Sequence, residues 1–76
     1  MKITATVISL NEERRISAAL ESLAWADEIV VVDSGSSDRT VEVASTFTDR
    51  VLHNPWPGYA AQKNYAAAAA TNDWVF

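Results

Sequence analysis

Residues 28–40 read EIVVVDSGSSDRT: an apolar run ends at one carboxylate, and a turn of small residues follows it. From Glu28 to Asp33 the run is nearly continuous in β-branched residues, which is typical of a parallel strand covered on both faces. Asp33 stands at the carboxyl end of that strand, on the edge where open α/β sheets bind their ligands. The stretch therefore predicts a buried parallel strand that brings one acidic side chain to a ligand-binding edge.

Three more strands are predicted around this one. The first covers Ile3 to Leu10, the third covers Arg50 to His53, and the fourth begins in the final run Asp73-Trp74-Val75-Phe76. With a helix between consecutive strands, the order β-α-β-α-β-α-β implies right-handed crossovers and an α/β fold. We expect a partial Rossmann-like parallel sheet in strand order 3-2-1-4, with helices on both faces. A ligand would lie in the crevice between the first and fourth strands.

The helices are placed by their caps and apolar stripes. Asn11 is a suitable N-cap for the first helix, and Glu12 and Glu13 place negative charge where the helix dipole favours it. The second helix begins with Ser36 or Ser37 as its cap, and the sequence alone leaves that choice open. The third covers Tyr59 to Ala70, which is rich in alanine. The expected sheet-facing positions of the first two helices are Ile16, Ala19, Leu20, Leu23, Ala24, Thr40, Val43, Ala44 and Phe47.

Size and charge limit the kinds of protein to which the chain could belong. Its 76 residues fall short of a domain of about 100 to 150 residues, so we expect part of a larger domain. A net charge of -4 and the lack of a Lys/Arg cluster argue against a nucleic-acid partner. Without cysteine there is no disulfide or thiolate metal site, and the apolar run Ile3 to Leu10 is too short to span a bilayer.

Asp33 is the first candidate for a binding residue. Its carboxylate could accept hydrogen bonds from a ribose hydroxyl or a base N–H, and it would do so more strongly than an amide. The alternative is that Asp33 only caps the following turn through the amides of Ser36 or Ser37. Gly35 stands alone in this turn, so the turn is not the three-glycine dinucleotide fingerprint.

Three further polar residues are candidates, each with a structural alternative. Asn11 and Glu12 follow the first strand and are expected beside Asp33, where either could contact a base. Helix capping and the helix dipole account for these two equally well. Lys63 could contact a diphosphate as a point charge, although a lysine on an alanine-rich helix is commonly just solvated.

The aromatic residues and the single histidine are predicted to have structural roles. Trp25, Trp56 and Trp74 are spread over three elements, and we expect them in the core or at its rim rather than in a stacking platform. His53 has no sequence neighbour that would make it a base or a metal ligand, and it is not taken as a site residue.

Several motifs, taken together and in order, resemble those of one enzyme family. They are Thr6-Val7-Ile8-Ser9-Leu10-Asn11-Glu12-Glu13, the run IVVVDSGSSDRT at 29–40, Gly58 with Gln62-Lys63-Asn64, and Asp73-Trp74-Val75-Phe76. They cover nearly the whole chain. At this spacing the chain resembles the amino-terminal part of family 2 glycosyltransferases, in particular the bacterial branch that adds glucose or a related sugar to the lipopolysaccharide core.

The resemblance implies a GT-A fold in which residues 1–76 are the amino-terminal part of a nucleotide-sugar-binding domain. It implies a UDP-sugar donor, a glycan or lipid-linked acceptor such as the lipopolysaccharide core, and inversion at the anomeric carbon. Asp33 would then bind the uridine, Asn11 and Glu12 would line the base pocket, and Lys63 would lie near the diphosphate. Ser34 stands where many members of the family carry a second Asp, which puts a second donor contact in doubt.

The family also has parts that these 76 residues do not contain. An Asp-x-Asp metal motif is expected after the fourth strand, and a later carboxylate is expected as the catalytic base. We therefore expect Mg²⁺ or Mn²⁺ only in a full-length parent, with no tightly bound ion, no catalytic residue and no activity in this stretch alone. The expected location is the cytoplasm, at the inner face of the cytoplasmic membrane, and the parent could be membrane-associated.

Two other classes of protein share this layout. A nucleotidyltransferase normally has a basic, glycine-rich loop after its first strand, whereas Asn11-Glu12-Glu13 is acidic. A non-catalytic interaction module could instead pair the edge of its fourth strand with a second copy of the chain. Self-association through that edge is also a possible property of the glycosyltransferase.

Overall fold

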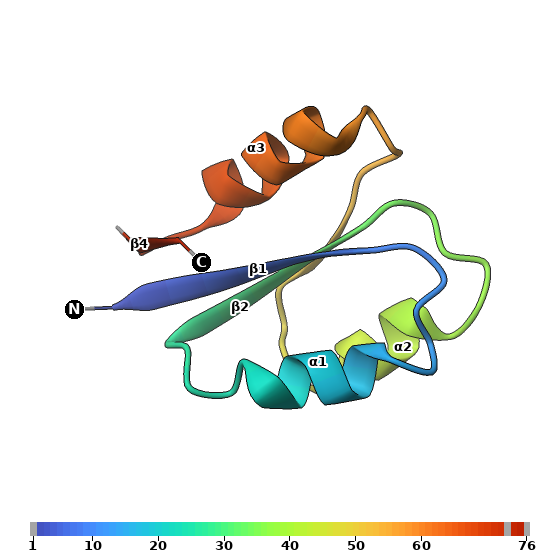
Figure 1. Ribbon diagram of the computed structural model, residues 1–76, viewed down its shortest axis with the longest axis horizontal. Coiled ribbons are helices and arrows are strands. Elements are labelled where there is room, and N and C mark those ends of the chain that lie inside the picture. Colours follow the sequence, from blue (N-terminus) through green and yellow to red (C-terminus); the bar gives the residue numbers. More distant parts are fainter. Residues whose placement is uncertain (1, 73, 76) are drawn as a thin grey trace.

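Strands and helices alternate along the whole chain, as the sequence predicts. The computed structural model describes residues 2–72 and 74–75 (Figure 1). The elements are β1 (Ile3–Ser9), α1 (Ile16–Ser22), β2 (Glu28–Asp33), α2 (Thr40–Ala44), β3 (Val51–His53), α3 (Tyr59–Ala69) and β4 (Trp74–Val75). The predicted α/β class is confirmed.

All the strands pair in parallel, and the sheet runs β3-β2-β1-β4. The sheet consists mainly of the first three strands, since β4 contributes two residues, which pair with Ile3 and Thr4. In register, Ser9 lies opposite Asp33, and Asp33 lies opposite His53. The carboxyl ends of β1, β2 and β3 therefore meet at one edge, which is the edge that the sequence assigned to ligand binding.

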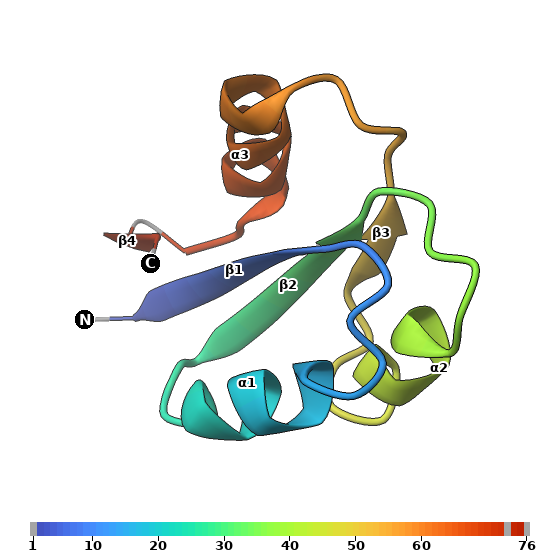
Figure 2. The ribbon, with the colours of Figure 1, turned by 45° about the vertical axis from the view of Figure 1, so that its right-hand side comes forward.

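Helices cover both faces of the sheet. Helices α1 and α2 lie on one face, and α3 lies on the other (Figure 2). Val31 packs with Ile16 and Leu20 on the first face, whereas Val30 and Val32 pack with Ala66 of α3 on the second. The three valines are fully buried because β2 has neighbours on both sides and both faces. This confirms the interpretation of the β-branched run as a central parallel strand.

The first two helices begin later than predicted. Asn11 is not an N-cap: its φ of 52° is left-handed, and α1 begins only at Ile16, after a turn in which the Glu12 carbonyl accepts hydrogen bonds from the amides of Arg15 and Ile16. Neither Ser36 nor Ser37 caps α2, which begins at Thr40. The N-cap position is Arg39, which makes no side-chain cap, and the Asp38 carboxylate accepts a hydrogen bond from the Thr40 amide at 2.9 Å. The Asn11 side chain bonds across to the loop after β2, where its oxygen accepts a hydrogen bond from the Ser37 amide, rather than to its own helix.

Part of the predicted apolar stripes of α1 and α2 is exposed. Ala19, Ala24 and Phe47 are exposed, while Ile16 and Leu20 of α1 and Thr40 and Ala44 of α2 are buried. Phe47 lies beyond the end of α2 and so does not continue its sheet-facing side. Helix α3 ends at Ala69, one residue before the predicted end.

Glu28 joins three segments at the amino edge of the sheet. Its carboxylate accepts hydrogen bonds from the Thr4 hydroxyl at 2.8 Å and from the Thr71 amide and hydroxyl at 3.0 Å, and the Arg50 guanidinium lies 3.2 Å away. Arg50 also donates to the Ala69 carbonyl at 2.7 Å. The hydrogen bond from the Thr71 amide is the main cause that lowers the pKa of Glu28 below its ordinary value. Glu28 thus holds the end of α3 against β1 and β2.

Among the helices of the described residues, none combines the length and apolar character needed to cross a membrane.

Candidate functional site

Asp33 closes the turn at the carboxyl end of β2. One carboxylate oxygen accepts hydrogen bonds from the amides of Gly35, at 3.0 Å, and Ser36, at 2.7 Å. The other accepts hydrogen bonds from the hydroxyls of Ser9, at 2.8 Å, and Ser36, at 2.6 Å. Asp33 is only 1% exposed, so the capping role named as the alternative is the one that the structure shows. Contact with a nucleotide stays a prediction.

Asp33 keeps its charge despite its burial. Burial raises the pKa of this carboxyl, but the hydrogen bonds from Ser36, Ser9 and Gly35 stabilise the charged form and together outweigh that effect. The net result is a pKa below the ordinary aspartate value. At neutral pH a full negative charge therefore lies under the edge of the sheet.

Asn11 and Glu12 join the loop after β1 to the loop after β2. The backbone amide of Asn11 donates to the Ser36 hydroxyl at 2.8 Å, and the Ser36 hydroxyl donates to Asp33. The Glu12 amide donates to the Thr40 hydroxyl at 2.8 Å. The Asn11 side-chain oxygen accepts a hydrogen bond from the Ser37 amide at 2.9 Å. These cross-loop bonds explain why Asn11 adopts a left-handed backbone conformation, which Asn tolerates better than most residues.

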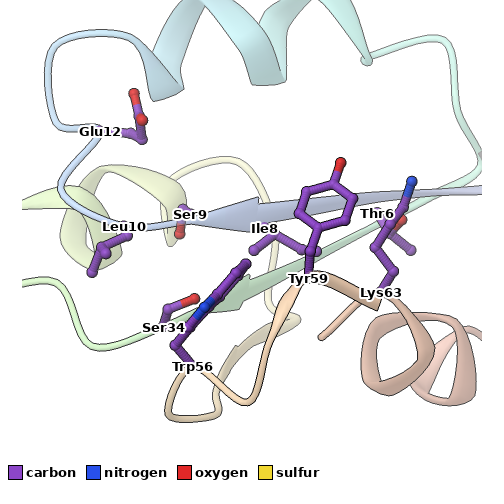
Figure 3. A pocket seen from close by; sticks show the side chains of 9 residues that line it. All are labelled: Thr6, Ile8, Ser9, Leu10, Glu12, Ser34, Trp56, Tyr59 and Lys63. Atoms are coloured by element: carbon purple, nitrogen blue, oxygen red, sulfur yellow. The ribbon is translucent and has the colours of Figure 1, made fainter. Parts of the chain in front are cut away.

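A cleft of about 530 Å³ opens between β1 and the start of α3 (Figure 3). Its polar and apolar walls are lined by Thr6, Ile8, Ser9, Leu10, Glu12, Ser34, Trp56, Tyr59 and Lys63. Glu12 lies at one end, and Lys63 lies with Thr6 at the other. A volume of several hundred Å³ and a largely apolar lining with a few charged groups are typical of a small-molecule site.

The cleft brings together only some of the predicted site residues. Glu12 and Lys63 line it, whereas Asp33 and Asn11 do not. Asp33 reaches the cleft indirectly, because it accepts the hydrogen bond of Ser9, which does line it. Asn11 lies in the neighbouring loop contact. Nucleotide binding by these four residues remains a prediction.

Sequence reasoning missed two aromatic residues of the cleft. Trp56 is 52% exposed and Tyr59 is 65% exposed, so neither belongs to the core. Their rings meet edge to face at 6.3 Å, and the Lys63 ammonium lies 5.4 Å from the centre of the Tyr59 ring. Trp25 is 55% exposed, so of the two positions expected for it, core or rim, the structure excludes the core. The side chain of Trp74 lies outside the described residues. The position of Trp56 in the loop after the third strand was the available signal, since that loop begins at the ligand-binding edge.

Gln62 fixes the start of α3 beside the cleft. It is fully buried; its side-chain nitrogen donates to the Asn54 carbonyl at 2.8 Å and to the Ser34 hydroxyl at 3.2 Å, and its oxygen accepts from the Asn54 side chain at 2.8 Å. Gly58, with φ 109° and ψ 156°, turns the chain into the helix in a conformation almost restricted to glycine. This framework holds the start of α3, with Tyr59 and Lys63, at the cleft beside β1.

The described residues offer no cluster of three His, Cys, Asp or Glu side chains that could hold a metal ion. A divalent ion held with fewer protein ligands would need the phosphates of a donor as well. The cleft itself has one carboxylate, one ammonium and exposed aromatic rings.

The sequence of this chain is similar to those of known proteins. The sequence profile described as glycosyl transferase family 2 matches residues 4–76. An uncharacterised glycosyltransferase of Rickettsia typhi is 44% identical over 75 residues, which cover 97% of this chain and 26% of the relative. The lipopolysaccharide core biosynthesis glycosyltransferase LpsC of Rhizobium meliloti is 38% identical over 81 residues, covering 100% of this chain and 30% of LpsC.

The chain thus spans about a quarter to a third of the length of these relatives. The match nevertheless extends through both loops of the ligand-binding edge, the cleft and helix α3, which lie within residues 4–76. The matched family is not that of the nucleotidyltransferase alternative. The chain belongs to glycosyl transferase family 2.

Proposed function

We propose that this chain provides the donor-binding part of a GT-A glycosyltransferase that uses a UDP-sugar and transfers the sugar with inversion. The proposed acceptor is a glycan or a lipid-linked saccharide such as the lipopolysaccharide core, the process named for the relative LpsC. In the complete domain we expect the sheet to keep the order 3-2-1-4. We also propose a cytoplasmic location, at the inner face of the membrane.

One observation carries the proposal: the cleft has a carboxylate at one end and an ammonium at the other. Thr6 and Leu10 both border the cleft, and the stretch 6–10 that joins them spans about 13 Å at the rise of an extended strand, which is too far for one small ion to bridge. A molecule with separate polar ends suits this length better. A nucleoside diphosphate has an N–H edge for Glu12 and phosphates for Lys63.

Asp33 could contribute to uridine binding in two ways. Direct contact requires the hydroxyl of Ser9 or Ser36 to turn away, because both carboxylate oxygens already accept two hydrogen bonds. In the indirect way, Asp33 holds Ser9 and the turn in place, and these groups contact the ligand. We propose the direct contact on the basis of the family resemblance, and Ser9→Ala would separate the two. Loss of the Ser9 hydroxyl frees one lone pair of Asp33. If Asp33 contacts UDP directly, the UDP affinity of Ser9→Ala should be equal to or higher than that of the wild type. If Asp33 acts only through Ser9, the affinity should fall.

The role proposed for the residues of the cleft is to bind and orient the donor. The donor diphosphate is proposed to need Mg²⁺ or Mn²⁺, which would neutralise charge on the leaving group, and the described residues contain no cluster of three His, Cys, Asp or Glu side chains that could hold that ion. We propose that the ligands of the ion and the base that deprotonates the acceptor belong to other parts of the full-length protein. The 76 residues alone should therefore bind a donor without transferring its sugar.

The proposal is tested with full-length protein by calorimetric titration with UDP, GDP, ADP and CDP, together with turnover of UDP-glucose in the presence of Mn²⁺. We expect preferential binding of UDP, and weaker binding after Lys63→Met. Asp49→Asn, at an exposed position away from the cleft, is the control and should bind like the wild type. If none of the four nucleotides binds the wild-type protein, the proposed function is wrong.

A further inference from the structure

Two large aromatic rings face solvent side by side at the cleft. Trp56 and Tyr59 are 52% and 65% exposed, and both line the cleft. Exposing rings of this size costs hydrophobic free energy, and aromatic side chains are enriched where ligands bind. Their edge-to-face contact at an interplanar angle of 64° limits the movement of each ring. The two rings together form one aromatic surface in the cleft.

The order of side chains along the cleft indicates what this surface would meet. From the Glu12 and Leu10 end toward the Thr6 end, Trp56 comes first, beside Ser34, and Tyr59 comes next, close to Lys63 (Figure 3). The ammonium of Lys63 lies over Tyr59, so the charged end of the cleft is at the Tyr59 side. Trp56 is therefore the ring nearer the carboxylate end.

We infer that Trp56 is the stacking platform for the nucleobase of the donor, an assignment that rests on the proposed function. Tyr59 supports Trp56 from the side and holds Lys63 by a cation–π contact at the place where the diphosphate would bind. Glu12 faces the N–H edge of the base. A planar ring stacked on an indole and joined to an anionic group satisfies all three features, whereas a free sugar or a lone phosphate satisfies only one.

The test measures the affinity of the full-length protein for UDP, UDP-glucose and pyrophosphate by calorimetric titration. Removing an aromatic partner of a base weakens binding by about 5-fold to 150-fold. We expect a loss of UDP affinity in this range for Trp56→Ala, while Trp56→Phe keeps most of the affinity because it keeps a ring. Binding of pyrophosphate, which has no base, should not change in either variant.

Trp25→Ala is the matched control, since Trp25 is 55% exposed and does not line the cleft. It should bind UDP like the wild type, and thermal unfolding of each variant checks that the fold is kept. Wild-type affinity of Trp56→Ala for UDP would overturn the inference, as would an equal loss for pyrophosphate. A loss seen only with UDP-glucose would place the hexose, not the base, on Trp56 and would also overturn it. If the wild type binds no nucleotide, the proposed function itself has failed.

Discussion

Replacing Asp33 tests whether one charged carboxylate holds the ligand-binding edge together. In Asp33→Asn the amide oxygen could still accept from the Gly35 and Ser36 amides, and the amide nitrogen could donate to the two hydroxyls, which are able to rotate. Hydrogen bonds to a charged group contribute about 1.5–3 kcal/mol, against about 0.5–1.5 kcal/mol for neutral partners. Loss of charge at two amide contacts should therefore cost about 2 kcal/mol.

Asp33→Ala removes all four acceptor contacts and should cost more, about 3–6 kcal/mol from the two amide contacts alone. Chains of this size are stabilised by only about 4–11 kcal/mol, so the alanine variant could fail to fold and the asparagine variant is the informative one. We expect Asp33→Asn to lower the free energy of unfolding in urea by about 2 kcal/mol. Faster hydrogen exchange at the Gly35 and Ser36 amides should accompany that loss.

Asp49→Asn, at an exposed aspartate, is the control and should leave the unfolding curve and both amides unchanged. The pH dependence gives a second check. Because the folded-state pKa of Asp33 lies below its ordinary value, its contribution is complete above the unfolded-state pKa and is lost as the pH falls through the lower, folded value. The difference between wild type and Asp33→Asn should thus shrink at acid pH. Equal stabilities at pH 7 would refute the argument that the charge holds this turn.

Three further substitutions test the framework around the cleft, each by urea unfolding of the full-length protein. Glu28→Gln should lower the free energy of unfolding by about 1–2 kcal/mol at neutral pH. The loss should be smaller in acid, because the folded-state pKa of Glu28 is also below its ordinary value. An unchanged unfolding curve at pH 7 would contradict the conclusion that Glu28 holds the end of α3. Gly58→Ala and Gly58→Asn should each lower the free energy of unfolding by about 1–3 kcal/mol. No side-chain clash arises at this position, so the backbone conformation alone opposes the substitutions. Wild-type stability of the Asn variant would contradict the backbone conformation described for Gly58. Gln62→Leu should lower the free energy of unfolding by about 1–3 kcal/mol, because it leaves the polar groups of Asn54 without their partners. It should also weaken UDP binding. A loss of stability with unchanged UDP affinity would show that Gln62 does not shape the cleft.

The central part of the fold was predictable because its signals are local and agree with one another. The run of valines in β2 needs burial on both faces, and only a central parallel strand provides it. The alanine-rich α3 has one strong helical signal and ends within one residue of its prediction. The starts of α1 and α2 were not predictable, because Asn11 and Ser36 are suitable caps by composition but bond to partners 25 residues away.

The candidate site shows a similar division. Asp33 and Glu12 were placed at the correct edge of the sheet by strand order, and Lys63 by its helix. Sequence could not show that Asp33 would be enclosed by hydrogen-bond donors, since Ser9 is 24 residues away in the chain. The loop position of Trp56 was the only sequence signal of its exposure, and the general preference of large aromatic residues for the core pointed the other way.

The hydrogen bonds that hold the edge of the sheet are also those that shape the cleft, so stability and binding are coupled there. Ser9 and Ser34 both line the cleft; Ser9 donates to Asp33, and Ser34 accepts from Gln62. The hydrogen bonds of Asp33 reach the cleft from the end of β2, and those of Gln62 reach it from α3. The two sets meet at Asp33 and Ser34, which are adjacent in the chain. Residues in shared networks have non-additive effects, whereas distant ones add. The effects of Asp33→Asn and Gln62→Leu on UDP affinity should therefore be non-additive, whereas either one combined with Glu28→Gln, at the opposite edge of the sheet, should be additive.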